Sequence, residues 1–228
     1  MTKKSNPENF SRLLCWAAAL ALITILAVCA AAWLLPAGTD LARENGVIEN
    51  GSVALWCLTL LLSIVLAIRA EAAQRLLFVW TGALALVAGA RELDAHIWLN
   101  PDHLGRFGVR YRTRWWVDDS VPLWLKLGWG LFFLILLWLV LYPPIKHMRV
   151  LFSGLRRGSR GVGLLVLAMG FLALGFVMDD LLRTSQALSV GTRQMIEETS
   201  EIIGAVLFLF GVFFLRETGG KTAPERGD

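Results

Sequence analysis

The stretch LLFVWTGALALVAGARELDAHIWLN, residues 76–100, decides how this chain should be interpreted. Its first part is a continuous apolar run, which is typical of a membrane helix because about 20 apolar residues at 1.5 Å each cross the ~30 Å of hydrocarbon in a bilayer. The run continues without a break into Arg91, Glu92, Asp94 and His96. Ionisable side chains within a membrane span are costly and usually functional. The stretch therefore predicts both a span and a site.

The rest of the chain is similarly apolar. Of its 228 residues, 56% are hydrophobic and 18% are charged, and the mean hydropathy is +0.60. This composition indicates a polytopic membrane protein and not a soluble domain. Apolar runs predict a single all-α membrane domain over 1–228 with six transmembrane helices, at residues 12–35, 52–69, 76–98, 121–142, 161–182 and 195–215. The polar tail, residues 216–228, is predicted to be disordered.

Lysine and arginine are concentrated in alternate connecting segments, which are the N-terminus, residues 70–75, residues 143–160 and the C-terminal tail. The positive-inside rule places these segments, and therefore both termini, in the cytoplasm. Short loops with this bias are typical of a bacterial inner membrane. The topology also accounts for the pI of about 9.3, so nucleic-acid binding is not needed to explain the basic charge.

With this topology the third and fifth helices run outward and the sixth runs inward, so their extracytoplasmic ends lie at one level. The acids at this level are Glu92, Asp94, Asp179, Asp180, Glu197, Glu198 and Glu201. Helical spacing places His96 four residues after Glu92 on one face, and it pairs Arg91 with Asp94 as a structural ion pair on another. The acids outnumber the nearby cations. Protonation, water or a bound cation must therefore balance the remaining charge.

A carboxylate and an imidazole on one helix face can hold a divalent metal such as zinc, iron or manganese. We expect the metal ligands to come from Glu92, His96, Asp179, Asp180, Glu198 and Glu201. Glu92, His96 and Glu201 are the predicted catalytic residues, in an open site where a carboxylate acts as general base on metal-bound water. Haem is not expected, because His96 is the one histidine at a useful membrane depth and bis-histidine ligation needs two.

The predicted outer loop, residues 100–122, alternates arginines with aromatic residues. Guanidinium groups match phosphate geometry, and aromatic rings are stable at the headgroup level. The loop therefore predicts contact with an anionic or phosphate-bearing membrane lipid, and an aromatic belt with basic anchors is the alternative. The candidate substrate-binding residues are Arg106, Arg110, Arg112, Arg114, Trp115 and Trp116.

These observations lead to three functional hypotheses. The first is a metal-dependent, hydrolase-type enzyme that acts on a lipid or lipid-linked substrate from the extracytoplasmic side. The second is a proton- or cation-coupled transporter, since carboxylates within a membrane also serve carriers, although carriers bind near the midplane and these acids lie near one face. The third is a non-catalytic membrane subunit or sensor whose charges form a structural network.

Overall fold

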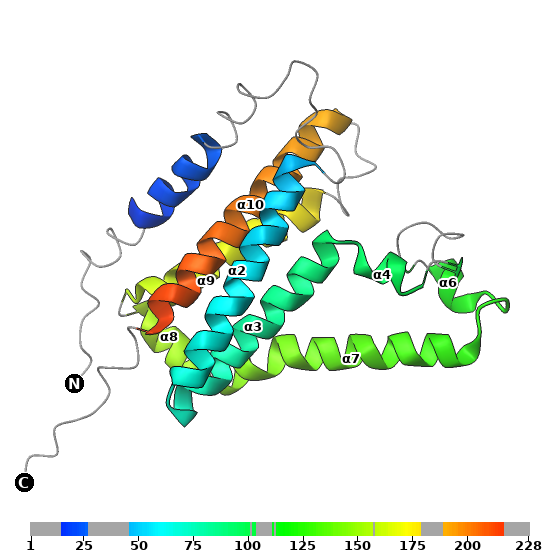
Figure 1. Cartoon of the computed structure of the whole chain (residues 1–228), viewed down its shortest axis with the longest axis horizontal. Coiled ribbons are helices and arrows are strands. Elements are labelled where there is room, and N and C mark those ends of the chain that lie inside the picture. The colour runs from blue at the N-terminus through cyan, green and yellow to red at the C-terminus, as the bar shows by residue number, and fades with distance from the viewer. Residues whose placement is uncertain are drawn as a thin grey trace, which may run out of the picture.

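The computed structural model describes residues 15–26, 46–100, 102–103, 111, 113–156, 158–178 and 189–216. Every regular element in these ranges is a helix, so the all-α prediction is confirmed. The helices are Cys15–Leu26, α2 (Val47–Arg69), α3 (Ala72–Glu92), α4 (Ala95–Trp98), α6 (Thr113–Val117), α7 (Leu123–Lys146), α8 (Met148–Arg156), α9 (Arg160–Phe176) and α10 (Val190–Leu215), as Figure 1 shows.

Among the described residues, two helices are long and apolar enough to cross a membrane, namely Val47–Arg69 and Gly191–Leu215. Three further apolar helices are shorter: Cys15–Leu26, Leu123–Leu139 and Arg160–Phe176. The second and sixth predicted spans are therefore long apolar helices. The set of six spans stays a prediction.

Several boundaries differ from the predicted ones. α10 begins at Val190, earlier than the predicted residue 195, because Ser189 caps it: the Ser189 hydroxyl accepts a hydrogen bond of 3.1 Å from the Thr192 N–H. α2 likewise begins at Val47 and not at residue 52. The segment 143–160, predicted as a connecting loop, contains the end of α7 and the whole of α8.

Four helices form the body of the molecule, in the order α9, α10, α2 and α3. Small residues bring α9 and α10 together: a Cβ on Gly161 would lie 2.5 Å from the Leu215 nitrogen, and one on Gly211 would lie 2.9 Å from a Leu165 side-chain carbon. The neighbours of Gly161 are backbone atoms, so that position admits only glycine, whereas the Leu165 side chain would have to shift for a larger residue at Gly211. The two helices therefore pack closely from Gly161 beside Leu215 to Gly175 beside Glu201.

α2 joins this pair to α3. On one side the Trp56 ring meets Phe208 of α10 edge-to-face, at 5.5 Å between centroids. On the other side the Ser63 hydroxyl lies 3.1 Å from the Thr81 hydroxyl of α3, and both are buried. These two contacts fix the position of α2 relative to α10 and of α3 relative to α2.

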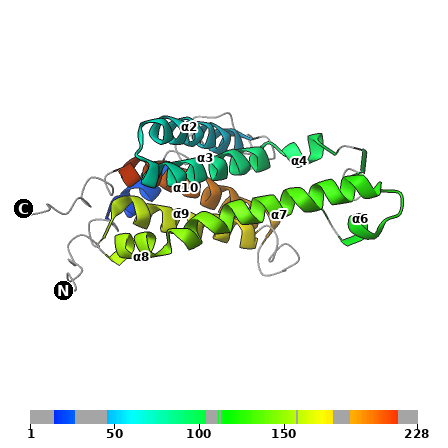
Figure 2. The ribbon, with the colours of Figure 1, turned by 90° about the horizontal axis from the view of Figure 1, so that it is seen from below.

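α7 packs less closely on the four-helix body than the other long helices do. It contacts α3 and α8 and then diverges toward α6, as Figures 1 and 2 show. Its far end is covered by a separate aromatic cluster in which the fully buried Trp115 packs with Val121 and Trp129. The four-helix body and this aromatic cluster are therefore two distinct hydrophobic cores.

Candidate functional site

The centre of the candidate site is an ion pair between α3 and α10. The Arg91 Nη1 atom lies 2.6 Å from Oε1 of Glu201 and 3.8 Å from Oε1 of Glu92. Both carboxylate side chains are 6% exposed, whereas the Arg91 side chain is 49% exposed. One partly exposed guanidinium is therefore shared by two buried carboxylates.

A glycine on the neighbouring helix makes room for Glu201. A Cβ added to Gly175 of α9 would lie 2.9 Å from the Glu201 Cγ and 3.4 Å from its Oε1. Because real Cβ atoms do not approach this closely, a larger residue would push the carboxylate away from Arg91. The α9–α10 contact thus positions the acid that Arg91 binds.

Further acids surround this ion pair. Glu49, Glu197 and Glu201 each lie within electrostatic range of both Glu92 and Glu198, so five carboxylates from α2, α3 and α10 gather in one region. We call these five residues, together with Arg91, the acidic cluster. The single charge of Arg91 offsets at most one of the carboxylates that it touches. Glu92 and Glu201 together therefore carry more negative charge than Arg91 alone offsets, and protons, water or a cation can balance the difference.

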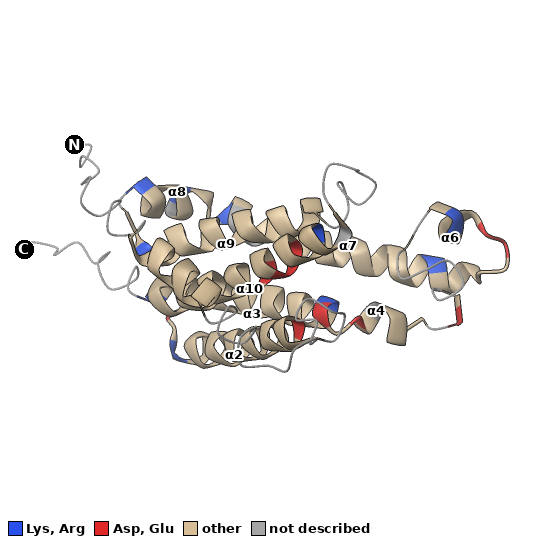
Figure 3. Ribbon diagram, turned by 90° about the horizontal axis from the view of Figure 1, so that it is seen from above, with Lys and Arg blue, Asp and Glu red and all other residues tan. Residues whose placement is uncertain are grey.

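The charged residues are distributed unevenly along the bundle (Figure 3), and the acidic cluster includes the basic Arg91. Figure 3 shows acidic residues of α2, α3 and α10 at one level, and basic residues gathered at the other end of the bundle around α8 and the start of α9. The described basic residues there are Arg69, Arg75, Lys146, Arg149, Arg156, Arg160 and Arg216. This separation agrees with the charge asymmetry expected from the sequence.

The predicted continuous helix over 76–98 is wrong at its end. α3 stops at Glu92, Asp94 takes a left-handed conformation with φ of +50°, and the short α4 begins at Ala95. An aspartate tolerates this conformation because its short polar side chain can bond locally. The four-residue spacing of Glu92 and His96 therefore no longer places them on one helix face. The His96 side chain is not among those described.

Arg91, which the sequence pairs with Asp94, also contacts carboxylates that spacing did not indicate. Glu201 and Glu92 are among the partners of Arg91, and Asp94 lies beyond the end of α3, at the start of α4. The Arg91–Asp94 pair stays a prediction. The sequence signal for Glu201 was present, since it is the deepest acid of its helix, but its partner could not be read from spacing. Arg91 and Glu201 are 110 positions apart.

The proposed metal ligands are brought together in part. Glu92, Glu198 and Glu201 belong to the acidic cluster, whereas Asp179 and Asp180 lie outside the described residues. Within the described part of the chain, no group of three or more His, Cys, Asp or Glu side chains converges as metal ligands would. The metal therefore stays a prediction, and the described carboxylates are its candidate ligands.

The predicted substrate-binding loop has its described residues on and near α6. Arg114 is exposed, whereas Trp115 is fully buried and its ring lies 5.0 Å from that of Tyr111. Trp116 is half-buried and packs against both rings. Burial raises the pKa of Tyr111 above its ordinary value. Trp115 thus organises the aromatic cluster, and Arg106, Arg110 and Arg112 lie outside the described residues.

No family model, curated protein or solved structure matches this chain. Function must therefore be inferred from the chemistry of its own residues. The features available for that inference are the acidic cluster, the opposite basic end and the distribution of apolar side chains over the helix surfaces.

Proposed function

We propose that this chain is an integral membrane protein with six transmembrane helices, and that it binds a cation at the acidic cluster. The membrane assignment is supported by α2, whose buried side includes Ser52, Thr59 and Ser63. Its exposed side carries Leu58, Leu61 and Ile68, the last of which is 74% exposed. This inside-out pattern is opposite to that of soluble helices and suits hydrocarbon surroundings.

The orientation proposed from the sequence fits the charge distribution. Basic residues near membrane-helix ends favour the cytoplasm, and the described ones gather at the end of the bundle that contains α8 (Figure 3). The acidic cluster would then lie in the extracytoplasmic half of the membrane. The proposed location is a bacterial inner membrane.

The observation that carries the cation-binding proposal is the sharing of one arginine by Glu92 and Glu201. A buried carboxylate without a compensating charge is unfavourable, and Glu198 adds another within the same electrostatic field. A divalent metal bound by Glu92 and Glu198 would offset this charge. His96, Asp179 and Asp180 are the further ligands that we propose from the sequence.

The reaction that we propose is metal-dependent hydrolysis of a lipid or lipid-linked substrate. A bound metal would supply an activated water, and Glu201, which Arg91 contacts, would accept a proton from that water or orient it. Arg114, exposed on α6, would contact an anionic lipid headgroup together with the neighbouring loop arginines. The same carboxylates could instead serve a proton- or cation-coupled carrier.

A structural charge network is the second candidate, and the 2.6 Å contact between Arg91 and Glu201 favours it. This contact joins α3 to α10, which both pack on α2. In that case the acidic cluster would stabilise the helix arrangement and would bind no metal. A non-catalytic subunit or sensor would need nothing more.

Metal content separates these candidates. Elemental mass spectrometry on detergent-purified protein should find a near-stoichiometric transition metal in the wild type and less than about a tenth of it in Glu92→Gln and Glu198→Gln. Glu71→Gln is the matched control, because Glu71 is an exposed acid at the opposite end of α3, and it should keep the metal. A folded wild type that stays metal-free after supplementation with zinc, iron and manganese would sink the enzyme proposal and leave the structural network and a proton-coupled carrier.

A further inference from the structure

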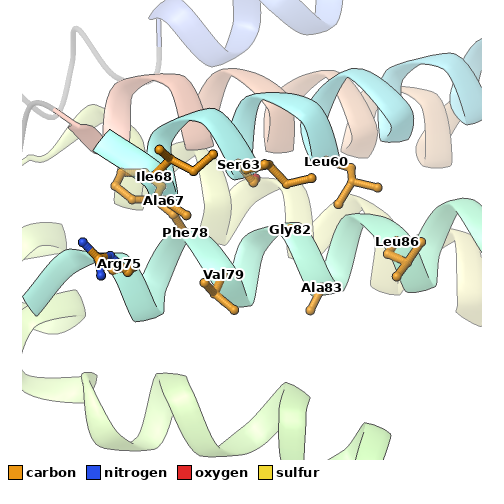
Figure 4. Close-up of a pocket in the computed structure, with 11 residues that line it drawn as sticks. Leu60, Ser63, Ala67, Ile68, Arg75, Phe78, Val79, Gly82, Ala83 and Leu86 are labelled. Atoms are coloured by element: carbon orange, nitrogen blue, oxygen red, sulfur yellow. The ribbon is translucent and has the colours of Figure 1, made fainter. Parts of the chain in front are cut away.

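α2 and α3 form a groove on their surface at the end of the bundle opposite to the acidic cluster. Its volume is about 580 Å³, which is within the range of small-molecule binding sites. Figure 4 shows the residues that line it, including Leu60 and Ile68 from α2 and Arg75, Val79, Ala83 and Leu86 from α3. Ala67, Gly82 and Ala83 are the smallest residues of this lining.

The lining is apolar along the groove and cationic at one end. Ser63 contributes a hydroxyl to the floor, but that hydroxyl already bonds to Thr81 at 3.1 Å. Arg75 lies at the end near the α2–α3 turn and donates one hydrogen bond, of 3.3 Å, to the Ala70 carbonyl oxygen. A guanidinium has five N–H donors in a fork that matches phosphate. The groove thus offers an anion site that continues into an apolar channel.

The length of this channel matches one leaflet of a membrane. Arg75 and Leu86 are eleven residues apart on α3, which is about 16 Å along a helix. Half of the hydrocarbon thickness is ~15 Å. With Arg75 at headgroup level, the apolar channel therefore ends near the bilayer midplane, as an acyl chain of that leaflet does.

We propose that this groove binds an anionic phospholipid of the cytoplasmic leaflet, with its phosphate on Arg75 and an acyl chain against Val79, Ala83 and Leu86. The cytoplasmic leaflet is the one whose negative surface attracts basic residues near helix ends. The inference rests on the membrane-spanning part of the proposed function and is independent of the cation site and its chemistry. Charge complementarity selects a lipid over a second copy of this chain, whose described surface at this end is also basic.

The test compares lipid retention in native mass spectrometry of the full chain purified from vesicles that contain equal amounts of phosphatidylglycerol and phosphatidylcholine. The wild type should retain phosphatidylglycerol about tenfold over phosphatidylcholine, the value of one charge-assisted contact, and Arg75→Gln should lose the preference. Arg149→Gln, a basic residue of α8 that does not line the groove, should keep it. Equal retention of both lipids by the wild type, or an unchanged preference in Arg75→Gln, would overturn the proposal.

A second variant tests the apolar part of the groove. Ala83→Trp should fill the channel and lower the retention of both lipids severalfold, while circular dichroism confirms the helical fold. Retention equal to that of the wild type would contradict the acyl-chain position. Glu198→Gln distinguishes this proposal from the cation site, since it should lose metal and retain lipid. A chain found in the soluble fraction after cell lysis would overturn the membrane assignment and the lipid proposal together.

Discussion

α3 carries an arginine near each end, and the two arginines have different surroundings. Arg91 is shared by the buried carboxylates of Glu92 and Glu201, whereas Arg75 is exposed at the mouth of an apolar groove. At one end the protein supplies more negative charge than the arginine can offset. At the other end Arg75 supplies a positive charge, and the other residues that line its groove are apolar apart from Ser63. The same residue type therefore indicates a cation site in one place and an anion site in the other.

The helices behind the two arginines also differ. Near Arg91, α3 is part of a packed arrangement in which Gly175 of α9 fixes the position of Glu201 on α10. Near Arg75, α2 and α3 expose large apolar residues such as Ile68 and Val79. Substitutions at the Arg91 end should therefore change the stability of the protein itself. Substitutions at the Arg75 end should change what the protein binds.

The largest effect is expected from Arg91→Met. This substitution removes the cation and leaves the carboxylates of Glu92 and Glu201 facing each other. Breaking a fully buried ion pair costs about 3–5 kcal/mol, and because Arg91 is half-exposed we expect a loss of about 2–3 kcal/mol in the free energy of unfolding. Denaturant titration in detergent micelles, followed by circular dichroism, measures it.

The control for this prediction is the equivalent change at the other end of α3. Arg75→Met should alter the free energy of unfolding in lipid-free micelles by less than about 0.5 kcal/mol, as surface substitutions usually do. Equal losses in the two variants would show that the contrast between the two ends does not exist.

A smaller effect is expected from Gly175→Ala. The new Cβ would lie 2.9 Å from the Glu201 Cγ, and overpacking of this kind typically costs about 1–3 kcal/mol. Gly170→Ala is the matched control on the same helix, because nothing lies within 4 Å of its added Cβ. It should stabilise the protein by about 0.5–1 kcal/mol, since alanine is the better helix former. Thermal unfolding of both variants would reveal a difference of opposite sign, and a stabilised Gly175→Ala would contradict the described position of Glu201.

Much of the helical framework could be predicted from sequence, because long apolar runs such as Val47–Arg69 allow few other structures in a chain of this composition. The proximity of Glu92 and Glu201 could also be predicted, because successive helices of opposite direction bring the end of one helix close to the start of another. The break at Asp94 did not follow. Its left-handed conformation ends α3 within a run whose local sequence is compatible with a continuous helix.

The details of the site depended on contacts between segments that are distant in sequence. Spacing alone favoured Asp94 for Arg91, whereas the structure brings in Glu201 across 110 positions. The burial of Trp115 depends on Tyr111 and on Trp129 of α7, and no local pattern indicated it. The groove beside Arg75 could not be predicted from the sequence either, because its lining comes from both α2 and α3 and depends on how these helices pack.

The smallest expected effect concerns the stability that a bound lipid adds. If Arg75 holds an anionic lipid, phosphatidylglycerol at about ten times its dissociation constant should stabilise the folded protein by about 1.4 kcal/mol, which corresponds to a rise of about 3–5 °C in Tm for a chain of this size. Phosphatidylcholine, which binds about tenfold more weakly, should then stabilise by about 0.4 kcal/mol and raise Tm by about 1 °C, and Arg75→Gln should respond equally to both lipids. Differential scanning fluorimetry in micelles with added lipid measures the shift. A phosphatidylglycerol shift that persists in Arg75→Gln would assign the lipid to the other basic residues of that end, and the contrast between the two arginines would then reduce to the stability effect of Arg91 alone.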